Sequence, residues 1–218
     1  MGAIPVTDRI IVGPACLDEG ADWLAQIEPS FATILPLLSP LSLRLKPDGF
    51  GPLLHIILGQ QVSVASADAL WSKLQAANMT TPLAVRSATQ DDLRGLGLSQ
   101  KKAQYAHAHA HALAEADINF DGLHHLPTDR VIKKLCAVKG IGMWTAEVYT
   151  MFSLGRADVF APGDLAIQEA AKLLFDLPER PNERTLRKMA DAWSPWRSVA
   201  ARLFWAYYAS TKQKDGII

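Results

Sequence analysis

The sequence has no long hydrophobic run, no excess of charge of one sign and no cluster of cysteines. Its apolar stretches fall short of the roughly 18 residues that a membrane-spanning helix needs. The start, MGAIPVTDRIIVGP, has no basic run ahead of an apolar segment, which argues against a secretory signal. Because 22 Lys and Arg balance 22 Asp and Glu, the formal net charge is zero, and a basic or acidic tail is not the dominant feature.

The chain has two cysteines, Cys16 and Cys136, which lie far apart in the sequence. They make no disulfide framework and no Cys-x-x-Cys metal spacing. Two cysteines also cannot supply the four thiolates that hold an iron–sulfur cluster. We therefore expect a reduced, cytoplasmic protein in which both cysteines are buried small residues.

The composition is otherwise that of a globular protein: 218 residues, 49% hydrophobic and 20% charged. This is enough for one or two compact domains. Helical periodicity runs through most of the chain, and strand-like alternation is confined to residues 9–12, so the predicted fold is all-α. We expect a single unit over residues 1–218 with two helical lobes, approximately 50–160 and 1–49 plus 161–218, and a cleft between the lobes.

Several residues mark the expected helix boundaries. Pro52 stands in the first turn of a predicted helix that is long, largely buried and continues to Leu74. Thr89 begins T-Q-D-D-L, which is similar to a capping box, and the short helix after it is stopped by Gly95 and Gly97. Further helices are expected to begin near Ser99, Thr128, Asn182 and Pro195.

Residues 135–152, LCAVKGIGMWTAEVYTMF, predict two helices joined by a short turn at K-G-I-G. The glycines allow positive φ, and the second helix presents its N–H groups and positive dipole end to an anion such as a backbone phosphate. The alternative is a plain αα-corner without a ligand. Downstream, Asp164 follows Pro162 and Gly163 near the start of the next helix, where a carboxylate is often only an N-cap.

A hairpin of this kind followed by a Pro-Gly-Asp turn resembles the signature of the helix-hairpin-helix DNA glycosylase superfamily, in which that Asp is catalytic. Five segments in the same order resemble one branch, the 3-methyladenine DNA glycosylase II family of bacterial alkylation repair. The chain is expected to be the compact form, without the extra N-terminal domain of larger members. The five segments are residues 50–74, 97–110, 138–151, 158–168 and 193–205.

The resemblance implies a monofunctional hydrolase that cuts the N-glycosidic bond of alkylated purines, chiefly 3-methyladenine, and leaves an abasic site in base excision repair. Asp164 would stabilise the positive charge that develops on the sugar. Relatives that also cleave the strand have a lysine nucleophile where this chain has Trp144, and an indole cannot act as an amine. A catalytically inactive DNA-damage-binding protein of the same fold is the alternative.

The resemblance also assigns the base pocket and the wedge that fills the gap left by a flipped base. Trp144 and Trp205 would face the cationic base, and Val148 replaces an aromatic residue of the best-known members. Gln61 takes the wedge position with Gln60 beside it. Without the resemblance, both glutamines could equally be polar caps on a buried helix surface.

At the hairpin, the implied DNA contacts are Lys139, Gly140 and Gly142. The backbone carbonyls of Cys136, Val138 and Ile141 would hold a monovalent cation, Na⁺ or K⁺, and no cofactor is required. The expected partner is double-stranded DNA containing alkylated bases, bound by a monomer that contacts no membrane. The implied location is the bacterial cytoplasm, at the nucleoid.

The histidines of the Ala-rich segment and the charge distribution complete the set of expectations. His107 and His111 lie at i and i+4 and could share a metal, but His109 points elsewhere and no acid completes the set, so a solvated or DNA-facing helix side is favoured. Residues 1–38 hold one base and five acids, a net charge of −4, and residues 180–214 hold eight bases and two acids, +6. We expect the basic C-terminal helices to contact DNA and the non-specific affinity to be modest.

Overall fold

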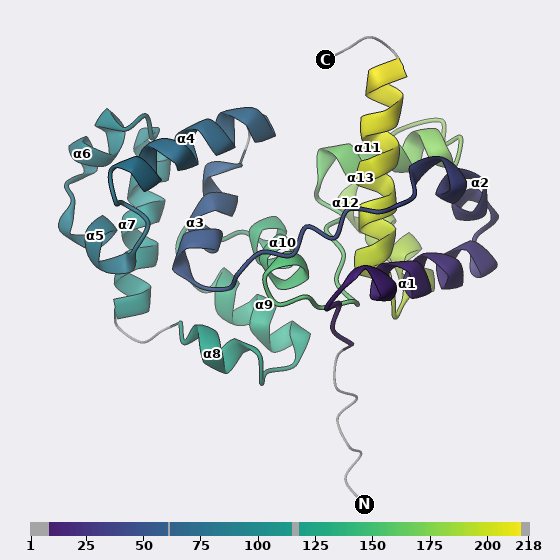
Figure 1. Cartoon of the computed structure of the whole chain (residues 1–218), viewed down its shortest axis with the longest axis horizontal. Coiled ribbons are helices and arrows are strands. Elements are labelled where there is room, and N and C mark those ends of the chain that lie inside the picture. Colours follow the sequence, from purple (N-terminus) through teal and green to yellow (C-terminus); the bar gives the residue numbers. More distant parts are fainter. Residues whose placement is uncertain (1–8, 61, 115–117, 215–218) are drawn as a thin grey trace, which may run out of the picture. The chain divides into compact units, whose positions relative to one another are not determined.

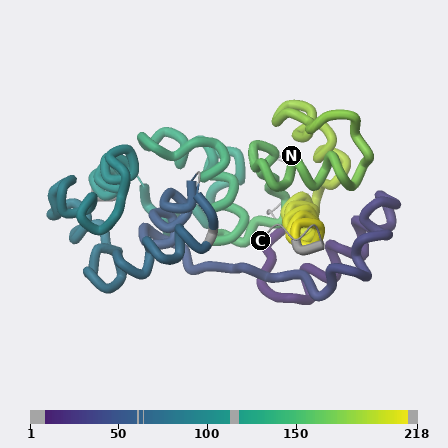
Figure 2. The backbone as a smooth tube through the Cα atoms, turned by 90° about the horizontal axis from the view of Figure 1, so that it is seen from above, coloured from purple at the N-terminus to yellow at the C-terminus, as the bar shows by residue number. Residues whose placement is uncertain are grey.

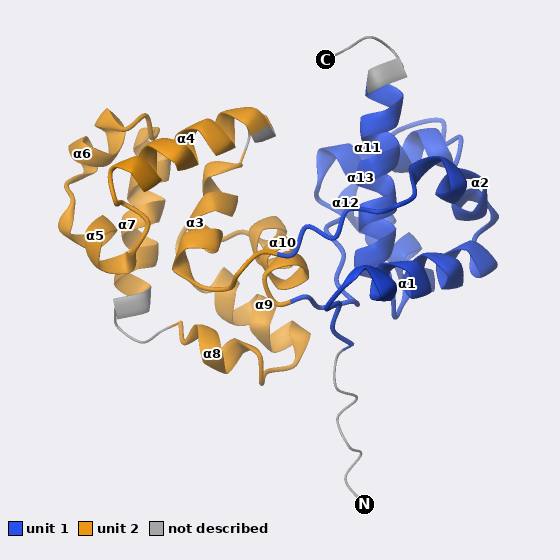
Figure 3. Cartoon of the chain, viewed as in Figure 1, with its two compact units in different colours: residues 1–45, 155–218 blue, residues 46–154 orange. Residues whose placement is uncertain are grey.

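The structure, a computed structural model, describes residues 9–60, 62–114 and 118–214. These residues form helices throughout, so the all-α prediction is confirmed. The strand-like residues 9–12 contribute one isolated β-bridge, between Ile10 and Arg156. The chain divides into two compact units, which Figure 3 shows in separate colours: unit 1 is Met1–Leu45 with Gly155–Ile218, and unit 2 is Lys46–Leu154. Within the described ranges, no helix is long and apolar enough to cross a membrane.

Unit 1 is built around its last helix. Figure 2 looks along this helix, α13, and shows the first two helices on one side and the other helices of unit 1 on the opposite side. Trp193 and Trp196 are buried here and belong to the core of this unit. The helices are α1 (Pro14–Ile27), α2 (Pro29–Leu38), α11 (Leu165–Leu174), α12 (Glu183–Met189), the 3₁₀-helix η1 (Ala190–Trp193) and α13 (Arg197–Lys214).

An aromatic cluster forms much of the core of unit 1. Its ring centroids lie 5.2–6.2 Å apart, mostly in edge-to-face arrangements, which aromatic pairs favour over face-to-face stacking. The cluster joins α2, α13 and the segments that flank α11, and this packing positions the beginning of α11. Its members are Phe31, Phe160, Phe175, Trp193 and Phe204.

Unit 2 has eight helices in its described residues (Figure 1). The alanines of α7 that face its core, Ala103, Ala106 and Ala110, are fully buried at three- and four-residue spacing, so small side chains explain the close packing of α7 on its neighbours. The helices are α3 (Phe50–Leu58), α4 (Val64–Ala76), α5 (Pro82–Ser87), α6 (Gln90–Gly95), α7 (Gln100–Ala114), α8 (Phe120–Leu123), α9 (Thr128–Cys136) and α10 (Met143–Phe152).

The predicted long helix from Pro52 to Leu74 is wrong: it is two helices, α3 and α4, separated by residues 59–63. Gly59 ends α3, and the Ser63 hydroxyl accepts a hydrogen bond from Ser66 N at 3.2 Å to begin α4. Both ends are therefore satisfied locally. Apolar periodicity did not reveal the break because α3 and α4 bury their apolar residues in one core.

Most other helix starts agree with the sequence. Thr89 and Asp92 form a capping box, in which Thr89 Oγ1 accepts from Asp92 N at 3.1 Å and Asp92 Oδ2 accepts from Thr89 N at 2.8 Å. Asn182 caps α12 through its side-chain oxygen. Thr128 is not an N-cap but the first residue of α9, after Pro127. Cys16 and Cys136 are free thiols and only half-buried, so the prediction that both are buried is wrong.

His109 contradicts the interpretation of its helix side as solvated, because its ring is 1% exposed and its Nε2 has no hydrogen-bond partner in the described part of the chain. Only His111 of the three is exposed. Across the described residues, no three His, Cys, Asp or Glu side chains are grouped so that they could hold a metal ion. His109 shares the inward face of α7 with Ala106 and Ala110, which are also buried.

Burial lowers the pKa of His109 from 6.5 to about 4. The unfolded chain therefore takes up a proton between pH 6.5 and 4 that the folded chain does not, so this histidine lowers stability as the pH falls through that window. We expect the free energy of unfolding to fall by about 3 kcal/mol from this group. Urea unfolding between pH 7.5 and 4 measures how the free energy of unfolding depends on pH. We expect this dependence to be weaker in His109→Gln and unchanged in His111→Gln. The same pH dependence in the wild type and His109→Gln would contradict the assignment of the effect to His109.

Candidate functional site

The residues singled out from the sequence fall in both units, and each unit contributes its own set. Asp164 and Trp205 belong to unit 1. Unit 2 holds the wedge segment and the hairpin, with Gln60, Lys139, Gly140, Gly142, Trp144 and Val148. Gln61 lies outside the described residues.

Asp164 is the N-cap of α11, so the capping role predicted as its alternative is confirmed. Its Oδ1 accepts a hydrogen bond from Ile167 N at 3.1 Å, and its own N–H closes the turn by donating to Ala161 O at 3.0 Å. The positive end of the α11 dipole favours a negative side chain at this position. The carboxylate is half-buried and held in one orientation, which is what a group acting through its charge needs.

Trp205, on α13, donates from its indole Nε1 to the same Asp164 Oδ1 at 3.2 Å. Sequence reasoning assigned Trp205 to the base pocket and gave no sign of this bond, because the two residues lie 41 positions apart. The bond fixes both side chains: the carboxylate gains a second donor, and the indole plane is set by its hydrogen bond. Unit 1 therefore presents a fixed carboxylate with an aromatic ring next to it.

The hairpin of unit 2 forms as predicted, with α9 and α10 joined by residues 137–142. Gly140 has φ +92°, and a Cβ there would lie 2.5 Å from Tyr105 Cγ, so only glycine fits. Gly142 is the N-cap of α10, and a Cβ built on it has no atom within 4 Å. The beginning of α10 is thus open to an approaching anion at Gly142.

Basic groups surround this turn. Lys139 is exposed, and it lines a hollow of about 480 Å³ together with Lys134 of α9 and His111 of α7. Trp144 is half-exposed in the first turn of α10, and Val148 lies one turn further along the same face and is 9% exposed. Unit 2 therefore brings together the expected phosphate contacts and, beside them, Trp144.

Gln60 connects the wedge segment to the hairpin. Its Nε2 donates to Thr145 Oγ1 at 2.8 Å and to the Gly140 carbonyl oxygen at 3.4 Å. Thr145 is buried on α10 and was missed by sequence reasoning, although a threonine among the apolar residues of a buried helix needs a partner and could have signalled one. These hydrogen bonds tie Gln60, just after α3, to the turn that presents Gly140.

The basic residues of the C-terminal segment differ in their surroundings. Arg180, Arg187 and Arg197 are ion-paired with Glu169, Glu183 and Asp158 at 2.6–2.9 Å. Arg202 is buried and donates to the carbonyls of Leu43 and Ser198, and burial lowers its pKa to about 9. The expectation that the C-terminal helices contact DNA is therefore wrong for Arg202, whose side chain is buried, and stays a prediction for the other basic side chains.

Comparison with known proteins places these features in a family. Residues 54–195 match the HhH-GPD superfamily of base excision DNA repair proteins. YfjP of Bacillus subtilis, whose name places it with the DNA-3-methyladenine glycosylases, is 32% identical over 124 residues, which are 57% of this chain and 43% of YfjP. DNA-3-methyladenine glycosylase 1 of Schizosaccharomyces pombe is 27% identical over 171 residues, covering 73% of this chain and 72% of its own.

A solved structure of a protein named as a 3-methyladenine glycosidase is also similar to this chain. The DNA-3-methyladenine glycosidase of Bacillus halodurans superimposes with a TM-score of 0.75 at 28% identity, over 94% of each chain. The present chain spans less than half the length of YfjP but nearly all of the Bacillus halodurans chain.

Proposed function

The chain belongs to the HhH-GPD superfamily of base excision DNA repair proteins, and on that basis we propose that it is a monofunctional DNA glycosylase that releases alkylated purines, chiefly 3-methyladenine, from double-stranded DNA. The observation that carries the proposal is Asp164, a carboxylate fixed by Ile167 N and the Trp205 indole at the start of a helix. The relatives described above carry the names of 3-methyladenine glycosylases and glycosidases, which supports the same substrate here.

The chemistry follows from what a fixed carboxylate can do. As the bond between the sugar C1′ and the base nitrogen breaks, the bonding electrons leave with the cationic base, and positive charge grows on the sugar. Asp164 stabilises that charge electrostatically. A water oxygen then adds to C1′ and loses a proton, which yields a free base and an abasic site.

Base recognition rests on the aromatic residues. An alkylated purine is electron-poor, and a π-face against it contributes about 0.5–2 kcal/mol through the cation–π interaction. Trp144 supplies such a face in unit 2 and Trp205 in unit 1. Stacking of this kind tolerates different bases, so the proposed substrate range includes other alkylated purines.

The hairpin carbonyls of Cys136, Val138 and Ile141 suit a hard cation, because a carbonyl oxygen has two lone pairs and Val138 O uses one for Ile141 N at 3.0 Å. A bound Na⁺ or K⁺ would supply positive charge for a DNA phosphate. The proposed partner is a duplex bound by a single copy of the chain at the hairpin, through Gly140, Gly142 and Lys139.

The proposal is tested by incubating a methylated duplex with the protein and analysing the strands before and after treatment with alkali. We expect breaks only after alkali, because hydrolysis leaves abasic sites intact and Trp144 provides no amine for strand cleavage. Intact strands after alkali would refute the glycosylase assignment. Breaks without alkali would show that another residue of the chain, such as Lys139, acts as an amine nucleophile.

A further inference from the structure

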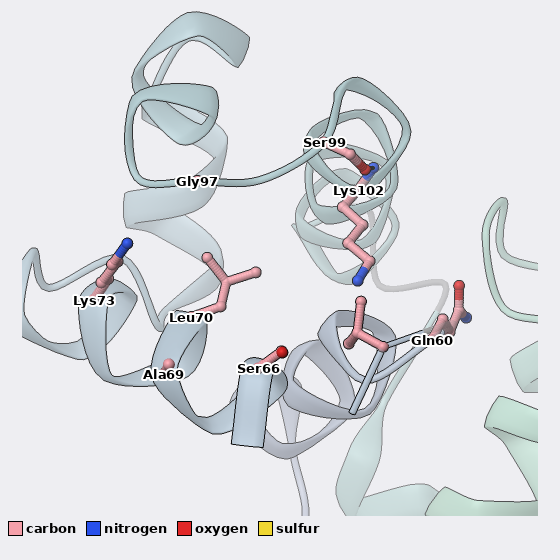
Figure 4. A pocket seen from close by; sticks show the side chains of 9 residues that line it. Gln60, Ser66, Ala69, Leu70, Lys73, Gly97, Ser99 and Lys102 are labelled. Carbon is pink, nitrogen blue, oxygen red and sulfur yellow. Dashed lines mark hydrogen bonds between the residues drawn. The ribbon is translucent and has the colours of Figure 1, made fainter. Parts of the chain in front are cut away.

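A hollow of about 550 Å³ lies in unit 2 beside the wedge segment (Figure 4). It is bounded by α4, by the turn between α6 and α7, by the first turn of α7 and by Gln60 at the end of α3. The side chains lining it include two ammonium groups, two hydroxyls and no carboxylate. Such a lining is suited to the oxygens of an anion.

The two ammonium groups are Lys73 and Lys102, which stand on opposite sides of the hollow, on α4 and α7 (Figure 4). Within the described ranges, neither forms an ion pair. Lys102 Nζ donates to the Leu58 carbonyl at 2.5 Å, and partial burial lowers its pKa. Lys73 Nζ lies beside Gly97, 3.9 Å from where a Cβ would stand. Both charges thus border the hollow without a counter-charge.

The starts of two helices border the hollow, on different sides of it (Figure 4). Ser66 lies in the first turn of the 13-residue helix α4, and Ser99 precedes the 15-residue helix α7, where its Oγ accepts from Lys102 N at 3.3 Å. The dipoles of both helices place positive potential at these ends, and their hydroxyls can donate to an anionic oxygen. The dipoles and the lysines are independent features that favour the same kind of ligand.

We propose that this hollow binds a backbone phosphate of the DNA, as a second phosphate site in addition to the hairpin. The inference rests on the proposed function, in which the substrate is DNA, a polyanion. Gln60 takes part in both sites: it lines the hollow, and it donates to Thr145 and to the Gly140 carbonyl of the hairpin turn. Gln60 therefore lies between the two proposed phosphate sites, and a duplex bound at both would be held next to this residue.

The first test measures binding of the full chain to a duplex that carries a stable abasic-site analogue, as a function of salt. We expect Lys73→Gln and Lys102→Gln each to weaken binding about three- to tenfold and to reduce the slope of log K against log salt by about one. Lys73→Gln is the decisive variant, because Lys102 also holds the end of α3. Lys101→Gln removes the same charge one residue away, outside the hollow, and is the matched control.

The second test locates the phosphate by replacing single linkages with neutral methylphosphonates, first in one strand and then in the other. We expect the methylphosphonate at one linkage to weaken DNA binding by the wild type and to cause no further loss of binding by Lys73→Gln. The strand that contains this linkage is the one whose phosphate occupies the hollow. The site is refuted if Lys73→Gln binds with the salt slope of Lys101→Gln, or if every linkage acts equally on the wild type and Lys73→Gln. A wild type that binds the duplex but releases no base from methylated DNA overturns the proposed function alone, and the methylphosphonate result still decides the site.

Discussion

Asp164→Asn is expected to lower the rate of base release by about 10²- to 10³-fold, the usual cost of removing a group that stabilises charge in the transition state. Asn preserves the shape of the side chain and is as good an N-cap as Asp. Its amide can still accept from Ile167 N and Trp205 Nε1, so the geometry is kept and only the negative charge is lost. Single-turnover release from methylated duplex DNA measures the effect.

The matched control is Asp176→Asn, the same chemical change at an exposed residue just after α11. Asp176 has φ +49°, a conformation that Asn also tolerates. We expect this variant to release base at the wild-type rate, and thermal unfolding to show both variants folded. Equal rates for Asp164→Asn and the wild type would mean that the carboxylate is only a helix cap.

Gly140→Ala is expected to destabilise the chain by about 2–4 kcal/mol and to weaken DNA binding at least about tenfold. The positive φ penalises any side chain, and the new Cβ would overlap Tyr105, whose Cγ stands 2.5 Å away. The turn must move to remove this overlap, and the movement also displaces the Gly140 carbonyl that accepts a hydrogen bond from Gln60. Urea unfolding and duplex binding measure the two effects.

Gly142→Ala provides the stability control for Gly140→Ala, two residues away in the same turn. Its φ is −84° and the added methyl meets no atom within 4 Å, so we expect a loss of at most about 1 kcal/mol, the cost of replacing an N-cap glycine by alanine. Equal losses of stability at the two glycines would contradict the geometry described for the hairpin.

The features predicted correctly from the sequence are those set by neighbouring residues. The hairpin turn, the capping box at Thr89 and the N-cap at Asp164 each depend on a few consecutive side chains and on backbone rules that act locally. Asp164 shows that a cap and a candidate catalytic group can be one residue, so the two interpretations were never exclusive.

The features that were missed depend on contacts between distant segments. The break at residues 59–63 has local caps but was hidden by apolar residues that continue on both sides. The bonds from Trp205 to Asp164 and from Gln60 to Thr145 span 41 and 85 positions. His109 is buried on the face of α7 that carries Ala106 and Ala110, and the sequence does not show which face of an alanine-rich helix packs inward.

Chromatographic identification of the free base is the most direct measurement of the central claim. A duplex labelled with methyl groups on its purines is incubated with excess wild-type protein, and with Asp164→Asn in parallel. We expect free 3-methyladenine to appear with the wild type, all released bases together to equal the abasic sites formed, and release to be at least about a hundredfold slower with the variant. No free base from the folded, DNA-binding wild-type protein would contradict the claim.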